Sequence, residues 1–183
     1  MHDFTIRTQR LLIRTFQKED WPAVYAYTAD RSVMHFIPGG RMTEAETQSY
    51  VNRQADDAPE AYAVLLPSQE RLIGHISFHP WFAPRTYEIG WVFHPDYYGR
   101  GYATEAARAM LDYGFETRNV HRVIATCQPE NPASWRVMEK LGMTREGHFR
   151  QCIEQPGGIW WDEYFYAALK AEWQEITRSA ASG

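Results

Sequence analysis

The hydrophobic period of the chain changes from that of strands to that of a helix near residue 100. Residues 62–66, 72–78 and 86–93 are rich in β-branched and aromatic residues and are separated by proline-containing segments, which predicts an antiparallel meander. From Ala103, apolar residues recur at helical spacing while charged residues occupy the other face. The apolar face comprises Ala103, Ala106, Ala107, Met110, Leu111, Gly114 and Phe115. The residues between these two patterns therefore connect a strand to a helix.

Shorter patterns predict the remaining elements. Asp20, Trp21 and Pro22 suit the start of a helix that reaches about Ala29. Thr43 and Glu46 have the spacing of a capping box, which predicts a helix running toward residue 54. We further expect strands at residues 11–13, 122–127, 144–153 and 160–169, and a helix at 132–141 that ends at Gly142. These elements form one domain over residues 1–178, followed by a frayed tail at 179–183.

Composition limits the classes of function. A chain of 183 residues with 44% hydrophobic residues suits one domain with a substantial core. The formal charge of -4 argues against binding nucleic acid, because neutralising phosphates requires a basic face. The sequence shows no leader and no run of about 20 apolar residues, so we expect a cytoplasmic protein that does not bind membranes. Cys127 and Cys152 lack metal-site spacing, which favours two buried small hydrophobic residues and no metal.

The segment from Tyr98 to Ala103 has the features of an anion site. Backbone N–H groups at the start of a helix lack partners within the helix, and the helix dipole favours negative charge there. Gly99 and Gly101 permit positive φ and a close approach to phosphate oxygens. The alternative is an ordinary connection between a strand and a helix. The segment lacks a P-loop motif, and Thr104 occupies the third glycine position of a dinucleotide fingerprint, which leaves coenzyme A as the phosphate ligand.

Four blocks of sequence bear on the function of this segment. They are QRLLIR at 9–14, EIGW at 88–91, GRGYATEA at 99–106, and NPAS at 131–134 continuing to EKLGM at 139–143. In these blocks the chain resembles the GNAT superfamily of acetyl-CoA-dependent N-acetyltransferases, and within it the RimJ/RimL-type ribosomal-protein-alanine acetyltransferases. The resemblance implies an α+β, three-layer αβα fold. Its mixed, mostly antiparallel sheet has splayed fourth and fifth strands, here residues 86–93 and 122–127, with the pantetheine arm of acetyl-CoA between them.

The resemblance also implies the site residues. Those assigned to cofactor binding are Trp91, Val92, Phe93, Gly99, Arg100, Gly101, Tyr102, Ala103, Thr104, Asn131 and Ser134. Two positions depart from common family patterns. Tyr98 stands where the family often has Gln or Arg, and Met138 stands where many members have a tyrosine that protonates the departing thiolate. RimJ/RimL-type sequences commonly lack this tyrosine and have a serine at the position of Ser134, so the proton-donating role is assigned to Ser134.

Each catalytic assignment has a structural alternative. Glu88 matches the position of a general base that acts through water, and its alternative is a solvated or ion-paired glutamate. Alternation places Glu88, Gly90 and Val92 on one face of their strand. Asn131 before Pro132 is also a helix N-cap, and both roles are compatible. Ser134 is alternatively an ordinary serine of a first helical turn.

Aromatic residues flank the implied cofactor cleft. Trp81, Phe82, Trp160 and Trp161 are candidates for the wall of an acceptor site, with core packing as the alternative. Asp162 and Glu163 follow the second pair and have the charge to attract an ammonium group, or they lie on a solvated strand edge.

Three functions remain open. The first is acetylation of a protein or peptide N-terminal amine, which is about one-tenth neutral at pH 7, whereas about one lysine in a few thousand is. The second is acetylation of a small amine such as an amino acid, polyamine or aminoglycoside. The third is a non-catalytic domain that senses acetyl-CoA, for which the absence of a tyrosine at Met138 is the main support. The expected partners are acetyl-CoA and an amine acceptor, and the expected state is a monomer or homodimer.

Overall fold

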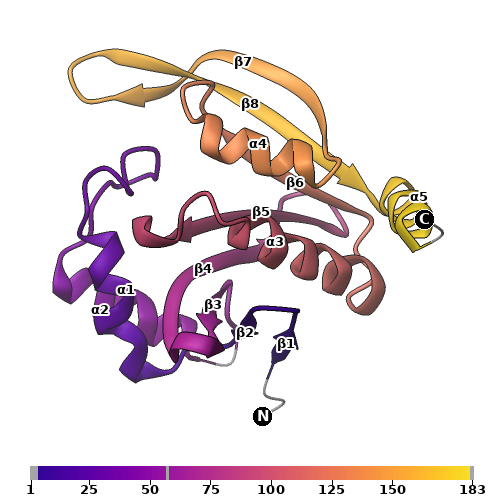
Figure 1. Cartoon of the computed structure of the whole chain (residues 1–183). Coiled ribbons are helices and arrows are strands. Elements are labelled where there is room, and N and C mark those ends of the chain that lie inside the picture. Colours follow the sequence, from indigo (N-terminus) through magenta and orange to yellow (C-terminus); the bar gives the residue numbers. More distant parts are fainter. Residues whose placement is uncertain (1–3, 57, 182–183) are drawn as a thin grey trace. The chain divides into compact units, whose positions relative to one another are not determined.

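The computed structural model describes residues 4–56 and 58–181, which form a mixed α+β fold (Figure 1). The strands are β1 Thr5–Arg7, β2 Leu12–Arg14, β3 Ala61–Leu66, β4 Arg71–Pro80, β5 Thr86–Phe93, β6 Arg122–Cys127, β7 Thr144–Gln155 and β8 Ile159–Leu169. The α-helices are α1 Trp21–Thr28, α2 Glu44–Gln54, α3 Tyr102–Asp112, α4 Pro132–Lys140 and α5 Lys170–Ala181. In hydrogen-bonding order the eight strands run β1-β2-β3-β4-β5-β6-β8-β7, and β5 pairs with β6 in parallel.

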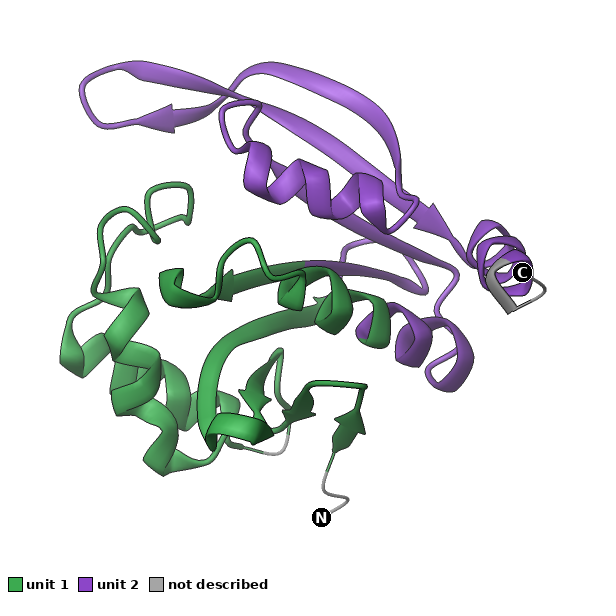
Figure 2. Cartoon of the chain, in the orientation of Figure 1, with its two compact units in different colours: residues 1–79, 90–109 green, residues 80–89, 110–183 purple. Residues whose placement is uncertain are grey.

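The chain divides into two compact units, coloured green and purple in Figure 2. Unit 1 consists of residues 1–79 and 90–109, and unit 2 of residues 80–89 and 110–183. The division falls within β5 and α3, so each of these elements contributes residues to both units. The single domain expected over residues 1–178 remains a prediction.

In unit 1, α1 and α2 pack against each other (Figure 1). The predicted capping box of α2 is confirmed: the Thr43 hydroxyl accepts from the Glu46 N–H at 3.3 Å, and the Glu46 carboxylate accepts from the Thr43 N–H at 2.7 Å. One core cluster of the unit unites both helices with β3 and β5 through Phe16, Val24, Tyr27, Met34, Val51, Ala61, Ala63 and Val92.

A polar pair is buried in this unit. The Tyr27 hydroxyl lies 2.7 Å from Nδ1 of His75, and both side chains are inaccessible or nearly so. Burial lowers the pKa of His75 to about 4, because the imidazolium would lose its hydration. His75 is therefore neutral in the folded protein near pH 7.

In unit 2, β8 pairs with β6 on one side and with β7 on the other. Helix α4 lies along these strands, where the Tyr166 hydroxyl donates to Glu139 at 3.3 Å (Figure 1). Helix α3 ends in a π-helical turn at Tyr113–Thr117. Trp173 of α5 is buried, and its indole N–H donates to the Asp112 carboxylate at 2.8 Å. This contact fixes α5 against the end of α3.

The structure corrects three expectations. Cys127 is buried as predicted, but Cys152 is exposed, because it lies on the terminal strand β7 at a register irregularity where Gln151 has φ 50°. Strand β1 and helix α5 were not predicted, because their patterns are three residues long in β1 and interrupted in α5. Helix α5 is described through Ala181, while residues 182–183 of the predicted tail lie outside the described residues. Within the described part of the chain, no helix has the length and apolar character needed to cross a bilayer.

Candidate active site

The glycine turn in unit 1 has the backbone conformation that its sequence predicts. Gly99 has φ 71° and Gly101 has φ 77°, in the left-handed region that side chains with a Cβ rarely adopt. A Cβ on Gly99 would meet no atom within 4 Å, and a Cβ on Gly101 would meet only Nη2 of Arg10 at 3.6 Å. The two glycines therefore serve the path of the chain, and the space beside each is open to a ligand.

Helix α3 begins directly after this turn. The Glu105 N–H donates to the Gly101 carbonyl at 3.0 Å, which makes Gly101 the first acceptor of the helical pattern. N–H groups earlier in the first turn have no acceptor within the helix and face outward along its axis. Tyr102, Ala103 and Thr104 are half-buried in this turn, and Arg100 is exposed beside it. The arrangement can bind an anion such as a diphosphate.

Arg10 clamps the turn, a role that sequence reasoning did not identify. Its Nε donates to Glu105 Oε2 at 2.6 Å, its Nη1 donates to the Arg100 carbonyl at 3.0 Å, and its guanidinium stacks over the Tyr102 ring at 4.5 Å. The Thr8 hydroxyl also donates to Glu105, at 2.6 Å. Burial alone would raise the pKa of Glu105, but these hydrogen bonds and the Arg10 charge lower it. The one hint of this clamp in the sequence was that Arg10 and Glu105 each lie in a block that carries the family resemblance.

Strand β5 approaches β4 closely next to the turn in unit 1. A Cβ on Gly74 would lie 2.6 Å from the Val92 carbonyl oxygen and 2.7 Å from the Phe93 ring, so only glycine fits there. The side chains of Val92 and Phe93 are buried, and Trp91 is half-buried. Val92 belongs to the core cluster of unit 1, which limits its part in any ligand site to backbone groups.

In unit 2, the parallel ladder between β5 and β6 is short. It joins Thr86–Glu88 to Arg122–Ile124 and stops before Ile89 and Ala125, which belong to the same unit. Backbone groups beyond the end of a ladder require other partners when they are buried. Glu88 is half-buried at this end, paired in register with Ile124.

Asn131 and Ser134 lie at the start of α4 in the same unit. The predicted N-cap is confirmed, since Asn131 Oδ1 accepts from the Ser134 N–H at 3.2 Å. Burial raises the pKa of the Cys127 thiol to about 12, although a hydrogen bond with the Ser134 side chain opposes this shift. Met138 is buried one helical turn further on and has no proton to donate.

Two of the candidate groups for the acceptor site in unit 2 have defined contacts. Trp81 stacks with Phe82 at 3.9 Å between ring centroids and lies 5.6 Å from Phe165 of β8. Asp162 accepts from the Gln151 N–H and pairs with His148 at 2.6 Å, on a different face of the β7–β8 hairpin. Asp162 is thus engaged within the hairpin.

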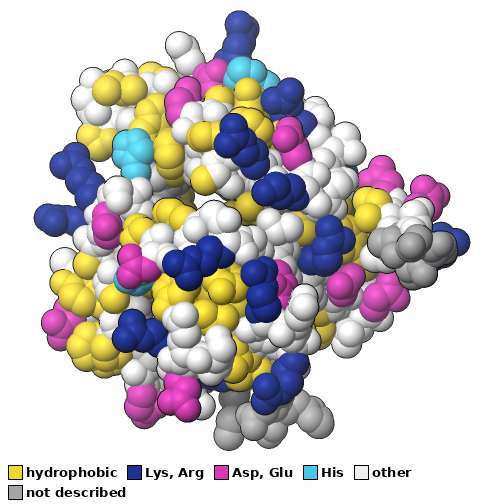
Figure 3. All heavy atoms as spheres, in the orientation of Figure 1, with side chains coloured by type: hydrophobic (Ala, Val, Ile, Leu, Met, Phe, Trp, Pro, Cys, Tyr) yellow, Lys and Arg dark blue, Asp and Glu magenta, His cyan; other side chains and the backbone are white. Residues whose placement is uncertain are grey.

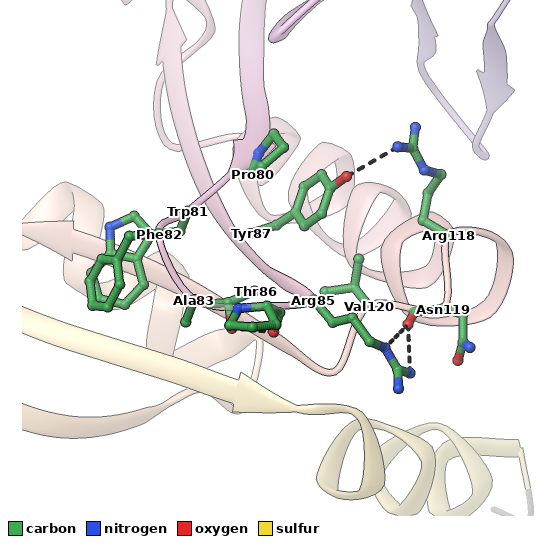
Figure 4. A pocket seen from close by; sticks show the side chains of 11 residues that line it. Pro80, Trp81, Phe82, Ala83, Arg85, Thr86, Tyr87, Arg118, Asn119 and Val120 are labelled. Atoms are coloured by element: carbon green, nitrogen blue, oxygen red, sulfur yellow. Dashed lines mark hydrogen bonds between the residues drawn. The ribbon is translucent and has the colours of Figure 1, made fainter.

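A separate open depression of about 470 Å³ lies at the beginning of β5 in unit 2 (Figure 4). Its lining includes the loop after β4, with the predicted acceptor-wall residues Trp81 and Phe82, and the residues before β6, but none of the predicted catalytic or cofactor-binding residues. Arg118 donates to the Tyr87 hydroxyl at 3.0 Å, and Arg85 donates to the Asn119 carbonyl at 2.8 Å. Both guanidinium groups are thus held by neighbouring oxygens, and the depression does not contain the predicted catalytic and cofactor-binding residues.

Both signs of charge appear on the surface drawn in Figure 3. On the face shown in Figure 3, basic side chains alternate with acidic, hydrophobic and uncharged ones. This face presents no continuous basic surface.

Comparison with known proteins places these features in a family. A family model described as an acetyltransferase (GNAT) domain matches residues 10–144. The uncharacterized N-acetyltransferase YnaD of Bacillus subtilis is 55% identical, over 92% of this chain and 98% of the relative. A GNAT-family acetyltransferase from Bacillus anthracis has a TM-score of 0.88 at 52% identity, covering 92% of this chain and all of that one.

A more distant structure shares the fold alone. Spermidine N-acetyltransferase from Vibrio cholerae, solved with CoA and spermine, has a TM-score of 0.79 at 22% identity, over 91% of this chain and 99% of that one. The eight-stranded, mostly antiparallel sheet and the glycine turn at the start of α3 agree with the expectations for this fold. The chain belongs to the GNAT family and is an acetyl-CoA-dependent acetyltransferase.

Proposed function

We propose that this protein acetylates the N-terminal α-amine of a peptide or protein. The observation that carries the proposal is the turn at Gly99 and Gly101. Its two positive φ angles leave the first N–H groups of α3 accessible to the cofactor's diphosphate. The RimJ/RimL-type blocks of the sequence support the choice of acceptor. We further propose that the protein is cytoplasmic and acts as a monomer or homodimer.

The residues present fit the cofactor. Backbone N–H groups from Gly99 to Thr104 would bind the diphosphate, with Arg100 adding charge and Arg10 holding the turn in place. Backbone groups of Trp91, Val92 and Phe93 would bind the pantetheine amides. The family resemblance also assigns Asn131 to cofactor binding. When bound, acetyl-CoA supplies a thioester whose carbonyl carbon the amine attacks.

Two side chains of unit 2 then handle protons. Glu88, at the end of the β5–β6 ladder, accepts a proton from the ammonium form of the acceptor, directly or through water. Ser134, in the first turn of α4, would donate a hydrogen bond to the leaving sulfur. A peptide α-amine has a pKa of about 7.7 to 8.0 and needs little assistance from a base at neutral pH.

Two other functions have specific support. The likeness in fold to spermidine N-acetyltransferase favours a small-amine acceptor. Met138, where many family members have a tyrosine, favours a domain that binds acetyl-CoA without turnover.

Thiol release from acetyl-CoA separates these functions. The assay compares peptides of one sequence with free and with blocked N-termini, and then free amino acids, spermidine and an aminoglycoside. We expect turnover with the free peptides alone, and mass spectrometry should place the acetyl group on the α-amine. Turnover with small amines alone would favour the second function, and cofactor binding without turnover the third.

Ser134→Ala tests the proposed donor. We expect kcat to fall about 10- to 100-fold with acetyl-CoA affinity unchanged, because the group acts on the leaving sulfur. Ser68→Ala is the control, since Ser68 is exposed in the turn after β3. An unchanged kcat in Ser134→Ala would remove Ser134 from the mechanism.

A further inference from the structure

The strand register of unit 2 divides its side chains between two faces of the sheet. Paired residues lie on the same face, so Glu88 shares a face with Ile124, its partner on β6. Ile124 pairs with Ala167, and alternation along β8 adds Trp161, Glu163 and Phe165 to this face. Phe149 on β7 pairs with Glu163 and joins them. We call this face, with Trp81, Phe149, Phe165, Glu88 and Glu163 as its main members, the Glu88 face.

The opposite face is occupied by polar contacts and by α4. Tyr166 hydrogen-bonds to Glu139 of α4, and Arg145 stacks over the Tyr164 ring at 4.5 Å. Asp162 pairs with His148 on that side. Trp160 alternates with Trp161 and therefore also lies on the opposite face. Trp160, a predicted wall residue, and Asp162, predicted to attract an ammonium group, thus do not belong to the Glu88 face.

Aromatic rings line the Glu88 face continuously. The Phe165 ring contacts Trp81 on one side, with centroids 5.6 Å apart, and Phe149 on the other, edge to face at 5.9 Å. Gly147 lies beside this row, since a Cβ there would be in van der Waals contact with the Phe149 ring at 3.4 Å and with Phe165 Cβ at 3.7 Å. Phe165 is half-buried and Phe149 is half-exposed, so the row presents apolar area to the outside.

Two carboxylates flank this row. Glu88 lies at the end of the β5–β6 ladder, and Glu163 lies beside Phe149 in the β7–β8 pairing. Aromatic faces and carboxylates both attract an ammonium group. The combination suits a molecule that carries an ammonium group next to a flat or bulky apolar group.

We propose that the Glu88 face selects the acceptor by its first residue: the row of Trp81, Phe165 and Phe149 binds an aromatic or large aliphatic side chain adjacent to the α-amine. This inference rests on the proposed function, because it assigns the side-chain specificity of the same reaction. An N-terminal Phe, Tyr or Leu is then a better acceptor than an N-terminal Ala or Ser.

The test uses peptides that differ only in their first residue. Thiol release gives kcat/KM for peptides beginning with Phe, Leu, Ala and Ser, in the wild type, Phe149→Ala, Phe165→Ala and Trp160→Ala. Trp160 is the matched control, since it is 48% exposed against 50% for Phe149 and lies on the other face of the same hairpin. Circular dichroism and acetyl-CoA affinity verify that each variant is folded.

We expect the wild type to prefer the Phe peptide over the Ala peptide by about tenfold or more, the usual discrimination of an apolar pocket. Phe149→Ala should reduce this preference to within about threefold, while Trp160→Ala keeps it. Equal kcat/KM for all peptides, or equal loss in Phe149→Ala and Trp160→Ala, would overturn the inference.

A different result would point to the proposed function instead. If no peptide is acetylated, that function fails, and calorimetric binding of the same peptides in the presence of coenzyme A tests the face without turnover. Tighter binding of the Phe peptide that is lost in Phe149→Ala would then still support selection by the Glu88 face. Binding that does not depend on the first residue would refute it.

Discussion

Replacing Gly101 by alanine should weaken cofactor binding while leaving the fold intact. Gly101 has φ 77°, and an L-residue with a Cβ in the left-handed region costs roughly 1–2 kcal/mol. The surroundings do not add to this cost, because the new Cβ would meet only Nη2 of Arg10, at 3.6 Å. In the free protein the exposed turn can relax to avoid the strain. Binding a diphosphate requires the original conformation, so the cost appears in the dissociation constant.

The expected result is an acetyl-CoA dissociation constant raised about 5- to 30-fold, which is the free-energy cost converted at 1.4 kcal/mol per factor of ten. Isothermal titration calorimetry measures it directly. The free energy of unfolding should change by less than about 1 kcal/mol, since the turn relaxes. Gly101→Trp, which also fills the approach to the backbone, should abolish binding.

Gly157→Ala is a matched control. Gly157 lies between β7 and β8 with φ 85°, and a Cβ there would meet no atom within 4 Å. The substitution introduces comparable strain outside the proposed cofactor site, so acetyl-CoA affinity should stay at the wild-type value. Wild-type affinity in Gly101→Ala and Gly101→Trp would refute the argument that this turn binds the diphosphate.

Three further perturbations test other parts of the structure. Arg10→Ala should raise the acetyl-CoA dissociation constant by about 2- to 5-fold in calorimetry, because an exposed ion pair contributes about 1 kcal/mol or less. An unchanged dissociation constant would show that cofactor binding does not need the contacts of Arg10. Trp173→Ala should lower the free energy of unfolding by about 3–5 kcal/mol in urea titrations, and a loss below 1 kcal/mol would contradict its burial. His75 has a folded pKa near 4, below the unfolded value of about 6.5, so its contribution to stability is full above pH 6.5 and is lost as pH falls toward 4. The wild type should therefore lose about 2 kcal/mol more than His75→Gln between pH 7.5 and pH 5, and parallel losses in the two proteins would contradict the shift.

Local patterns predicted most elements of the fold because they depend on neighbours in sequence. The bounds of β6, the capping box of α2 and the N-cap at Asn131 agree with the sequence expectation, since each rests on residues within a few positions. Helix α5 was not predicted because a contact distant in sequence positions it. Trp173 is held by its hydrogen bond to Asp112, 61 residues earlier. Cys152 was placed wrongly because a register irregularity in β7 disrupts simple alternation.

The sequence by itself determined the glycine turn, since positive φ at Gly99 and Gly101 is a property of residues without a Cβ. Only the tertiary structure showed that Arg10 clamps this turn through Glu105, 95 residues away. Only the strand register showed that Glu88, Phe149 and Phe165 share a face while Trp160 does not. Local conformation follows from the covalent geometry of each residue, whereas the partners of a side chain follow from pairings between distant strands that no local pattern encodes.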